Sequence, residues 1–565
     1  MNSEFMESLQ IHSYKFSKKG LKEYELNPYV SSSWPIVYII KNDKEAYVGE
    51  STNAYARMKN HLANERRDNL KEILMISCDK FNKSATLDIE SLLISYMDAD
   101  RKYKLQNGNA GLVDHRYYQR SSYRVVFEHI WDQLRQKDYA KNPIDRLDNS
   151  DFFKYSPYKS LSVDQHNSVV EILNVMANST IDTIFVEGGA GTGKSVLAIY
   201  LMKLLVTEIE DYHLDESDDV YSEQINNLLE FKKRYPNPKV ALVVPMTSLR
   251  KTLKNVLGSV KGLKANMVIG PSEVIKEDYD IILVDEAHRL RQRISLPSYT
   301  NFDMMNRELG LDKHEGTQLD WIIKKSKHQI LFYDETQTIK PTDIDKERFS
   351  ELKKGGAKSI QLSSQLRVKG GSDYIEFVDN LLHARFENGE PKFTSKQYDL
   401  RIYDSLSEMR RDVLNLEKDH GLCRLLAGYS WPWLSKNDPN SFDIEIDGLK
   451  LKWNSVAIDW VNSANAVNEV GCIHTSQGYD LNYAGVIFGN EIKFNPKTKE
   501  IEIDRDEYHD GPAKRGIKKP GMLKEYIINI YKTMMLRGIK GTFIYVSNPE
   551  LRNYLQQFIL DAKEM

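Results

Sequence analysis

The sequence predicts an α/β protein with a small α+β domain at its N-terminus and two later halves that each contain a parallel sheet. From residue 181 onward, continuous apolar runs alternate with helical segments, as is typical of parallel strands buried on both faces. Earlier, residues 34–49 contain two short apolar runs joined by Asn42-Asp43-Lys44, which indicates a hairpin. A chain of 565 residues has room for about three or four domains.

Composition and charge exclude several classes of protein. With 41% hydrophobic and 28% charged residues, the chain can bury several cores and is not a disordered chain. It has no apolar run of about 18 residues and no signal-peptide pattern, so we expect no membrane partner. Three distant cysteines favour a reduced cytoplasmic setting. The net charge of -3 excludes a bulk basic coat for nucleic acid but permits a local basic groove.

The N-terminal domain is predicted to span residues 1–140. After the hairpin, a helix is expected from about Asn53, whose side chain can cap it, and a second helix from the apolar spacing of residues 85–99. Residues 101–141 are basic and aromatic and are predicted to be the DNA-contact surface of this domain, with lysines and arginines on phosphates and tyrosines on unpaired bases. Any single one of these residues could instead be part of an ordinary solvated helix face. Residues 141–160 carry Pro, Asp, Asn and Ser without a clear period, which predicts a linker.

The two later halves are expected at residues 161–360 and 361–565. An acidic insertion at 208–219 is predicted to be a surface loop. The strand candidates of the first half are 183–189, 239–245, 280–286 and 328–335, and those of the second are 423–429, 469–475, 483–489 and 541–547.

A phosphate-binding motif, G-x-x-x-x-G-K-[ST], lies between the first of these strands and a helix. Gly188, Gly191 and Gly193 let backbone N–H groups turn toward phosphate oxygens, and the helix N-terminus adds its dipole. Lys194 is expected to reach the β- and γ-phosphates of ATP, and Ser195 to ligate Mg²⁺.

A second motif, Asp-Glu-Ala-His, ends another apolar strand 90 residues after Ser195. Asp285 would help to hold Mg²⁺. Glu286 would polarise the water that attacks the γ-phosphate. Together the two motifs predict a nucleoside triphosphatase.

From about residue 155 to 560 the chain resembles a superfamily 1 helicase motor, and more narrowly the Schlafen group 3-like helicase domain. Six further motifs carry the resemblance: LSVDQ, VVPMTSLRK, YDETQ, LSSQLR, CIHTSQGYD and YKTMMLRGIKG. Four of them contain a residue with an expected role, namely Gln165 in the first, Gln337 in the third, Arg367 in the fourth and Arg537 in the sixth. The resemblance implies two RecA-like lobes, an adenine contact by Gln165 and a γ-phosphate sensor at Gln337. It also implies that Arg367 and Arg537 reach the nucleotide, with Arg537 as the arginine finger.

Two short signatures, Ile36-Val37-Tyr38 and Tyr47-Val48-Gly49, place two tyrosines nine residues apart on the hairpin, and Arg57, His61, Glu90 and Asn107 follow them in order. By these residues, the segment 34–109 resembles a GIY-YIG nuclease. The resemblance implies a Mg²⁺ at Glu90, stabilisation of the transition state by Arg57, and activation of water by Tyr38, alone or with His61. Tyr47 would hydrogen-bond the phosphate or that water. Asn107 completes the set, although Asn109 lies in the same loop. Two hairpin tyrosines or a lone helical glutamate would ordinarily be structural, so the prediction depends on their occurrence together.

The sequence therefore predicts an ATP-dependent nuclease in which a motor engages nucleic acid and a tethered domain cuts it. We expect DNA rather than RNA, and a role in microbial defence against foreign DNA. A regulatory NTPase switch with a non-cleaving N-terminal module is the alternative, and a DNA-repair enzyme shares the same chemistry. The oligomeric state is left open.

Overall fold

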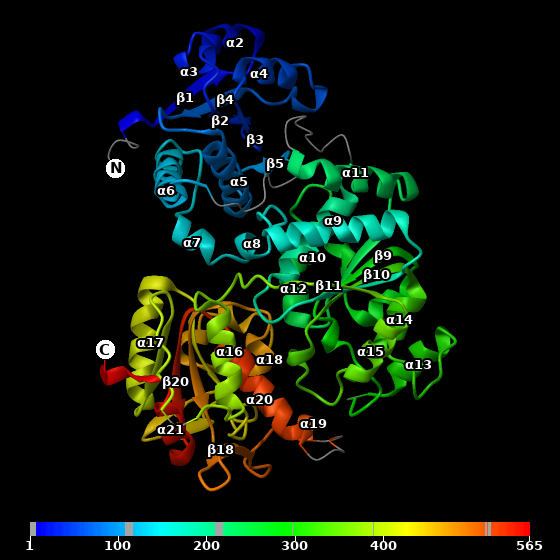
Figure 1. The fold of residues 1–565 in the computed structure, drawn as a ribbon, viewed down its shortest axis with the longest axis vertical. Helices are drawn as coiled ribbons and strands as arrows, with labels where there is room; N and C mark the ends of the chain where they lie inside the picture. The colour runs from blue at the N-terminus through cyan, green and yellow to red at the C-terminus, as the bar shows by residue number, and fades with distance from the viewer. Residues whose placement is uncertain are drawn as a thin grey trace. The chain divides into compact units, whose positions relative to one another are not determined.

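A computed structural model describes residues 7–107, 117–208, 219–296, 298–387, 389–514, 517 and 521–564. Figure 1 shows the helices and strands of the chain, labelled and coloured by residue number. The chain forms two compact units and passes between them several times. The first unit contains Met1–Thr180, Ser195–Val240 and Leu253–Met267. The second contains Ile181–Lys194, Ala241–Thr252 and Val268–Met565.

The first unit contains a five-stranded sheet in the order β1-β4-β2-β3-β5. Its strands are β1 (Gln10–Lys15), β2 (Ile36–Lys41), β3 (Glu45–Ser51), β4 (Glu72–Ser77) and β5 (Lys104–Leu105). The predicted hairpin is confirmed, because β2 and β3 pair antiparallel with Tyr38 opposite Gly49. The Asn42 side chain accepts hydrogen bonds from the backbone of Lys44 and Glu45, 2.7 Å each, and so fixes the turn.

Both helices predicted for this domain are present. Helix α4 (Ala54–Leu62) is capped by Asn53, which accepts from the Ala56 N–H, and α5 (Lys83–Asp100) is capped by Asn82. Helix α5 packs on β2 and β3, and the buried side chains of β2, β4 and α4 form the core of the domain. Its other helices are α2 (Lys18–Glu25), α3 (Pro28–Ser31) and α6 (Arg120–Gln136).

Residues 141–160, expected to be a linker, are packed structure instead. They form α7 (Ile144–Asp148) and α8 (Asp151–Lys154), which both pack on α5. Ser156 donates to the Asp98 carboxylate over 2.8 Å, and Tyr158 is 1% exposed. Helices this short have no readable periodicity, so tertiary contacts rather than local sequence determine them. Helices α9 (Val163–Asn178) and α11 (Asp219–Arg234) pack together next, and most of the acidic insertion lies outside the described residues.

The second unit contains a six-stranded sheet in the order β11-β6-β10-β9-β7-β8. The ladders of β6 with β10 and β11, of β9 with β10, and of β7 with β8 are all parallel. All four strands predicted for this half are confirmed. The strands are β6 (Thr183–Glu187), β7 (Val240–Val243), β8 (Val268–Ile269), β9 (Tyr279–Val284), β10 (Ser326–Tyr333) and β11 (Lys358–Gln361).

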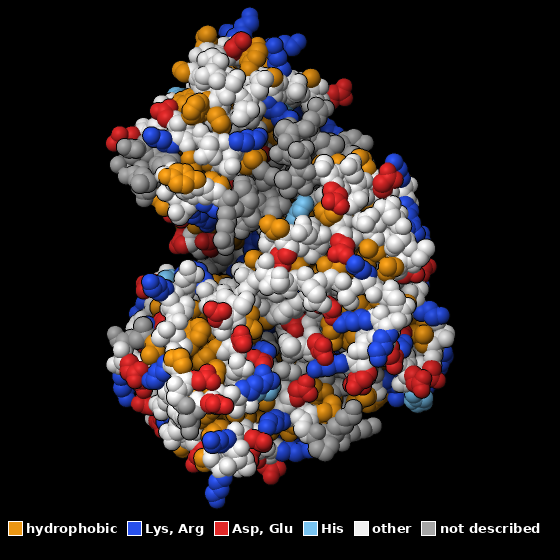
Figure 2. All heavy atoms as spheres, in the orientation of Figure 1, with side chains coloured by type: hydrophobic (Ala, Val, Ile, Leu, Met, Phe, Trp, Pro, Cys, Tyr) orange, Lys and Arg blue, Asp and Glu red, His pale blue; other side chains and the backbone are white. Residues whose placement is uncertain are grey.

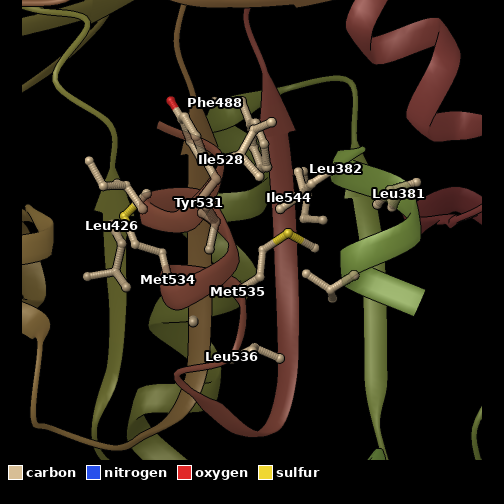
Figure 3. Close-up of a cluster of buried hydrophobic side chains, with 14 of the residues drawn as sticks. Leu381, Leu382, Leu426, Phe488, Ile528, Tyr531, Met534, Met535, Leu536 and Ile544 are labelled. Carbon is tan, nitrogen blue, oxygen red and sulfur yellow. The ribbon is translucent and has the colours of Figure 1, made fainter. Parts of the chain in front are cut away.

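A second parallel sheet follows, in the order β16-β13-β17-β20-β12-β21, and includes a strand from each of the four predicted segments. Of the segment 469–475, however, only Val470–Gly471 is strand, and α18 begins at Ile473. Helix α20 (Met522–Met535) buries its apolar face against this sheet, where Tyr531 stacks on Phe488 with ring centroids 4.1 Å apart (Figure 3). The strands are β12 (Asp399–Tyr403), β13 (Cys423–Ala427), β16 (Val470–Gly471), β17 (Leu481–Phe488), β20 (Gly538–Val546) and β21 (Leu560–Asp561).

Further helices and two small hairpins complete the chain. Within the described ranges, no helix has both the length and the apolar character needed to cross a bilayer. On the face shown in Figure 2, basic and acidic side chains are intermixed, in agreement with the near-neutral net charge. The remaining elements are α10 (Lys194–Val206), α12 (Thr247–Leu257), α13 (Thr300–Glu308), α14 (Gln318–Lys325), α15 (Lys346–Lys354), α16 (Gly371–Leu382), α17 (Leu406–His420), α18 (Ile473–Ser476), α19 (Gly511–Lys514), α21 (Pro549–Gln556), β14 (Ile444–Ile446), β15 (Leu449–Leu451), β18 (Ile492–Asn495) and β19 (Glu500–Ile503).

Candidate functional site

The glycine-rich loop predicted to bind phosphate joins β6 to α10. Gly191 and Gly193 have φ angles of +83° and +79°, a left-handed conformation that favours glycine. The Lys194 ammonium, 7% exposed, donates to the backbone carbonyls of Gly188 at 2.5 Å and Gly189 at 2.8 Å. Ser195 follows in the first turn of α10. The loop thus holds its own lysine inward, at the N-terminus of α10.

Asp334, which the sequence analysis did not single out, connects this lysine to Gln337. Its Oδ2 lies 3.3 Å from Lys194 Nζ and accepts from the Gln337 amide over 2.6 Å. Burial alone would raise the pKa of the Asp334 carboxyl, but Lys194, His288 and hydrogen bonds from Gln337 and Thr336 hold it below its usual value. Asp334 ends β10 as Asp285 ends β9, and this shared position after an apolar strand was the signal that could have found it.

Asp285 and Glu286 follow β9 directly, as predicted. Glu286 has a left-handed φ of +54° and is 8% exposed, and its Oε2 lies 3.1 Å from His288 Nε2. Burial tends to raise the pKa of the Glu286 carboxyl, but His288, Lys194 and Arg537 hold that pKa well below its usual range. Glu286 is therefore ionised at neutral pH. Such a carboxylate orients and polarises water well but is a weak base.

The two candidate arginines lie in different surroundings. Arg537, 2% exposed, donates from Nη1 to the Tyr479 carbonyl over 3.3 Å and acts electrostatically on Glu286. Arg367 instead pairs its Nε with Asp480 Oδ1 at 2.6 Å. The arrangement brings Arg537 to the group that contains Lys194 and Glu286.

The segment before Arg367 packs on the phosphate-binding loop itself. Gln365 donates to the Ala190 carbonyl over 2.7 Å, and the Leu366 N–H donates to the Gly191 carbonyl over 2.9 Å. A Cβ added to Gly191 would lie 2.1 Å from Gln365 Oε1. The left-handed backbone angle therefore favours glycine at position 191, and the Gln365 side chain would have to move to admit any other residue.

Two of the helicase-like motifs, VVPMTSLRK at 243–251 and CIHTSQGYD at 472–480, are also linked within the second unit. Ser248 Oγ lies 2.8 Å from the Tyr479 hydroxyl and accepts from the Asp459 N–H over 2.8 Å. Arg289 donates to the Gln477 side chain over 2.8 Å. The motif at 243–251 and the motif at 472–480 therefore contact one another.

Gln165, predicted to contact adenine, caps a helix. The Gln165 side-chain oxygen, Oε1, accepts from the Ser162 backbone N–H over 3.0 Å, and the Gln165 backbone N–H donates to Ser162 Oγ over 3.4 Å. Together these two hydrogen bonds form a capping box at the start of α9. Gln165 lies in the first compact unit, whereas Gly188, Gly191, Gly193 and Lys194 lie in the second.

In the N-terminal domain, four of the six predicted residues form one cluster. The Tyr38 hydroxyl lies 2.8 Å from His61 Nε2, and Arg57 Nε donates to the same hydroxyl over 3.4 Å. The Tyr47 ring centroid is 5.0 Å from that of His61. A Cβ on Gly49 would lie 2.3 Å from the Tyr38 hydroxyl, so glycine opposite Tyr38 is what admits its ring.

Arg67 is a fifth member of this cluster that the sequence analysis missed. Its guanidinium lies 3.8 Å from the centre of the Tyr47 ring, and its Nη1 lies 3.2 Å from His61 Nε2. Arg67 is 4% exposed and ends a 3-10 turn, Glu65–Arg67, just after α4. Because arginine can only donate, His61 Nε2 must accept, so the Tyr38 hydroxyl donates to it as well.

The remaining two predicted residues lie near this cluster in different ways. Glu90, half-buried on α5, is close enough for its charge to raise the pKa of Tyr38. Burial is the largest cause of that rise and Tyr47 adds to it, against the opposing effect of Arg57, so the pKa of Tyr38 lies well above its usual value. Tyr38 is therefore a neutral phenol, not a base by itself. Asn107 is buried and bonds both backbone groups of Val48 at 3.1 and 2.9 Å, while Asn109 lies outside the described residues.

The basic and aromatic stretch at 101–141 is largely used by the fold. Helix α6 buries Tyr123 and Trp131, and Arg124 donates to the Tyr96 hydroxyl over 2.6 Å. Lys102 pairs with Asp138 at 2.6 Å. Tyr123 is therefore not available to stack on a base, although Tyr118 is 83% exposed.

Each predicted magnesium site offers few protein ligands. Among the described residues, no three His, Cys, Asp or Glu side chains gather as a metal cluster. Mg²⁺ commonly binds through one or two carboxylates, with water and substrate phosphate completing its shell. A lone carboxylate such as Glu90 or Asp285 fits that preference.

Comparison with known proteins gives a family match and several relatives. The family model described as "Schlafen group 3, DNA/RNA helicase domain" matches residues 182–548, about two thirds of the chain. An uncharacterized protein of Saccharomyces cerevisiae is 25% identical over 406 residues, which cover 66% of this chain and 83% of the relative. The N-terminal sheet lies outside the family match.

Solved structures show weaker likenesses. The Pif1 helicase from Bacteroides, in complex with ADP-AlF3 and ssDNA, is 11% identical with a TM-score of 0.26, over 67% of this chain and 91% of that one. A DEAD box protein from Methanococcus jannaschii is 13% identical with a TM-score of 0.23, over 74% and 94%. Both scores are too low to carry a structural comparison.

Proposed function

Because the chain belongs to the Schlafen group 3 DNA/RNA helicase domain family, we propose that residues 161–565 form an ATP-driven motor that acts on nucleic acid. The observation that supports this best is the convergence of Lys194, Asp334 and Glu286 in one buried charge network, with Arg537 acting on Glu286. Residues 161–360 and 361–565 would be its two lobes.

The residues of this network divide the work of hydrolysis. ATP supplies the scissile phosphoanhydride bond, and a bound Mg²⁺ would neutralise charge on its oxygens. When ATP binds, the Lys194 ammonium donates to phosphate oxygens instead of to the carbonyls of Gly188 and Gly189. Gln337 responds to this change because Gln337 and Lys194 both contact the Asp334 carboxylate. Glu286 orients the attacking water, and Arg537 stabilises negative charge as it develops.

We further propose that residues 1–140 form a DNA endonuclease of the GIY-YIG type that the motor controls, in a microbial defence role. The support is the cluster of Tyr38, Tyr47, Arg57 and His61 beside Glu90. Glu90 would hold the Mg²⁺ ion, and Arg57 would stabilise the charge of the transition state.

The donors in this cluster set the direction of a proton path. Arg57 donates to the Tyr38 oxygen, and Tyr38 donates to His61 Nε2. A water molecule on Tyr38 can then lose its proton to the phenol oxygen as the phenol proton passes to His61. This relay uses a neutral tyrosine, consistent with its raised pKa.

The test is cleavage of supercoiled plasmid DNA in Mg²⁺, with and without ATP, by the full chain and three variants. Wild type and Glu128→Ala, which removes an exposed glutamate of α6, should both cut, and Glu90→Ala should not. The Lys194→Ala protein shows whether the motor permits cleavage or restrains it. Cleavage that survives Glu90→Ala would contradict the metal assignment. If no condition gives cleavage, the nuclease proposal fails while the motor proposal stands.

A further inference from the structure

A cavity of about 390 Å³ lies at the amino ends of the strands of the second parallel sheet, apart from the phosphate-binding loop. Register places Asp399 of β12 and Tyr483 of β17 both opposite Gly541 of β20. A Cβ on Gly541 would lie 2.7 Å from the Tyr483 ring, so glycine here lets that aromatic ring lie across the sheet. The volume is within the range of small-ligand sites.

The lining of this cavity is strongly basic. Lys369, Lys396, Arg401 and Lys540 all line it, together with one acid, Asp399. Arg401 takes both oxygens of Asp399, at 2.6 and 2.7 Å. That pairing neutralises the acid of the lining, and the other three charged side chains of the lining are all lysines.

One of these lysines, Lys540, also contacts a histidine side chain. Lys540 Nζ lies 3.0 Å from His420 Nδ1, and the His420 ring stacks on Tyr483. Lysine can only donate, so His420 Nδ1 accepts. Burial lowers the pKa of His420 and both Lys540 and Lys369 lower it further, against the opposing charge of Asp419. Positive charge concentrated in this way beside an aromatic wall suits an anionic ligand.

We propose that this cavity binds a phosphate-bearing anion of about mononucleotide size, with its phosphate on Lys369 and Lys540. The site lies within the segment proposed as the motor, but none of its lining residues has a proposed role in hydrolysis or cleavage. The phosphate could come from a free nucleotide or from a nucleic-acid strand, because both present the same oxygens to the lysines.

Its position gives the site a consequence for the motor. The Lys369 backbone N–H donates to the Ile539 carbonyl over 3.0 Å. Lys369 lies two residues after Arg367, and Ile539 lies two residues after Arg537, so this hydrogen bond joins the segments that carry the two arginines. A ligand that draws Lys369 and Lys540 together therefore acts on the segments that carry both candidate arginines.

The test measures two probes in a Lys194→Ala background, which removes the lysine of the other phosphate site. Calorimetry follows 5′-AMP, and fluorescence anisotropy follows a labelled single-stranded oligothymidylate. Lys369→Gln/Lys540→Gln should weaken at least one probe tenfold or more, as expected when charged hydrogen bonds are lost. The matched control, Lys436→Gln/Lys497→Gln, removes two exposed lysines of the same unit and should change neither probe by more than twofold.

The pattern of losses identifies the source of the phosphate. If 5′-AMP binding is weakened, the phosphate comes from a free nucleotide. If only oligonucleotide binding is weakened, the phosphate comes from a nucleic-acid strand. Lys396 is exposed, so we expect Lys396→Gln to fold even if the double variant does not. It should weaken binding of the same probe about threefold. Unchanged affinity for both probes in Lys396→Gln and in a folded double variant would overturn the proposal.

Discussion

Replacing Glu286 by glutamine changes one charge in the proposed hydrolysis site and almost nothing else. The glutamine keeps the shape of a side chain that is 8% exposed, and it removes the carboxylate that faces His288 at 3.1 Å. Removing a group that orients and polarises water costs a factor on the order of 10²–10⁴ in rate. At about 1.4 kcal/mol per tenfold, that is about 3–5 kcal/mol of barrier.

The assay combines single-turnover hydrolysis with equilibrium binding of a fluorescent nucleotide. Glu286→Gln should hydrolyse on the order of 10²–10⁴ times more slowly, while nucleotide affinity stays within a few-fold of wild type. Glu277→Gln, at an exposed position just before β9, is the matched control and should behave as wild type. Hydrolysis within threefold of wild type, or a variant that no longer binds nucleotide, would refute the role given to Glu286.

Three further substitutions test other parts of the account. Lys194→Ala should abolish ATP hydrolysis, because the ammonium that would reach the phosphates is lost, and wild-type turnover would refute the site. Arg537→Ala should slow hydrolysis about 10³-fold or more while nucleotide still binds, and loss of binding instead would argue against a finger role. Arg67→Ala removes a buried cation from the Tyr47 ring and a donor to His61. It should lower the free energy of unfolding by about 2–4 kcal/mol in urea titrations and abolish DNA cleavage, whereas a loss below about 1 kcal/mol would contradict the packing described.

Local signals made the strands, the hairpin and the phosphate-binding loop predictable. The hairpin depends on Asn42, whose side chain closes the turn within three residues. The loop depends on glycines at 191 and 193 with positive φ, and on an apolar strand before them. Each of these features is encoded within a few residues, so the sequence carries it directly.

Features that depend on distant packing were not predictable. Asp334 matters because it meets Lys194 across 140 residues, and Arg67 because a 3-10 turn directs it onto Tyr47. Residues 141–160 fold because α5 offers a surface for two short helices. The role of Gln165 could not be decided from the sequence, because a glutamine three residues after a serine is typical of a helix cap as well as of the adenine-contacting motif.

The most direct test of the central claim, an ATP-driven motor that acts on nucleic acid, is the rate of ATP hydrolysis by the full chain with and without single-stranded DNA. We expect ATP hydrolysis that single-stranded DNA stimulates and that Lys194→Ala abolishes in both conditions. Hydrolysis that is indifferent to DNA, together with assembly that depends on ATP, would contradict the motor and favour a regulatory switch.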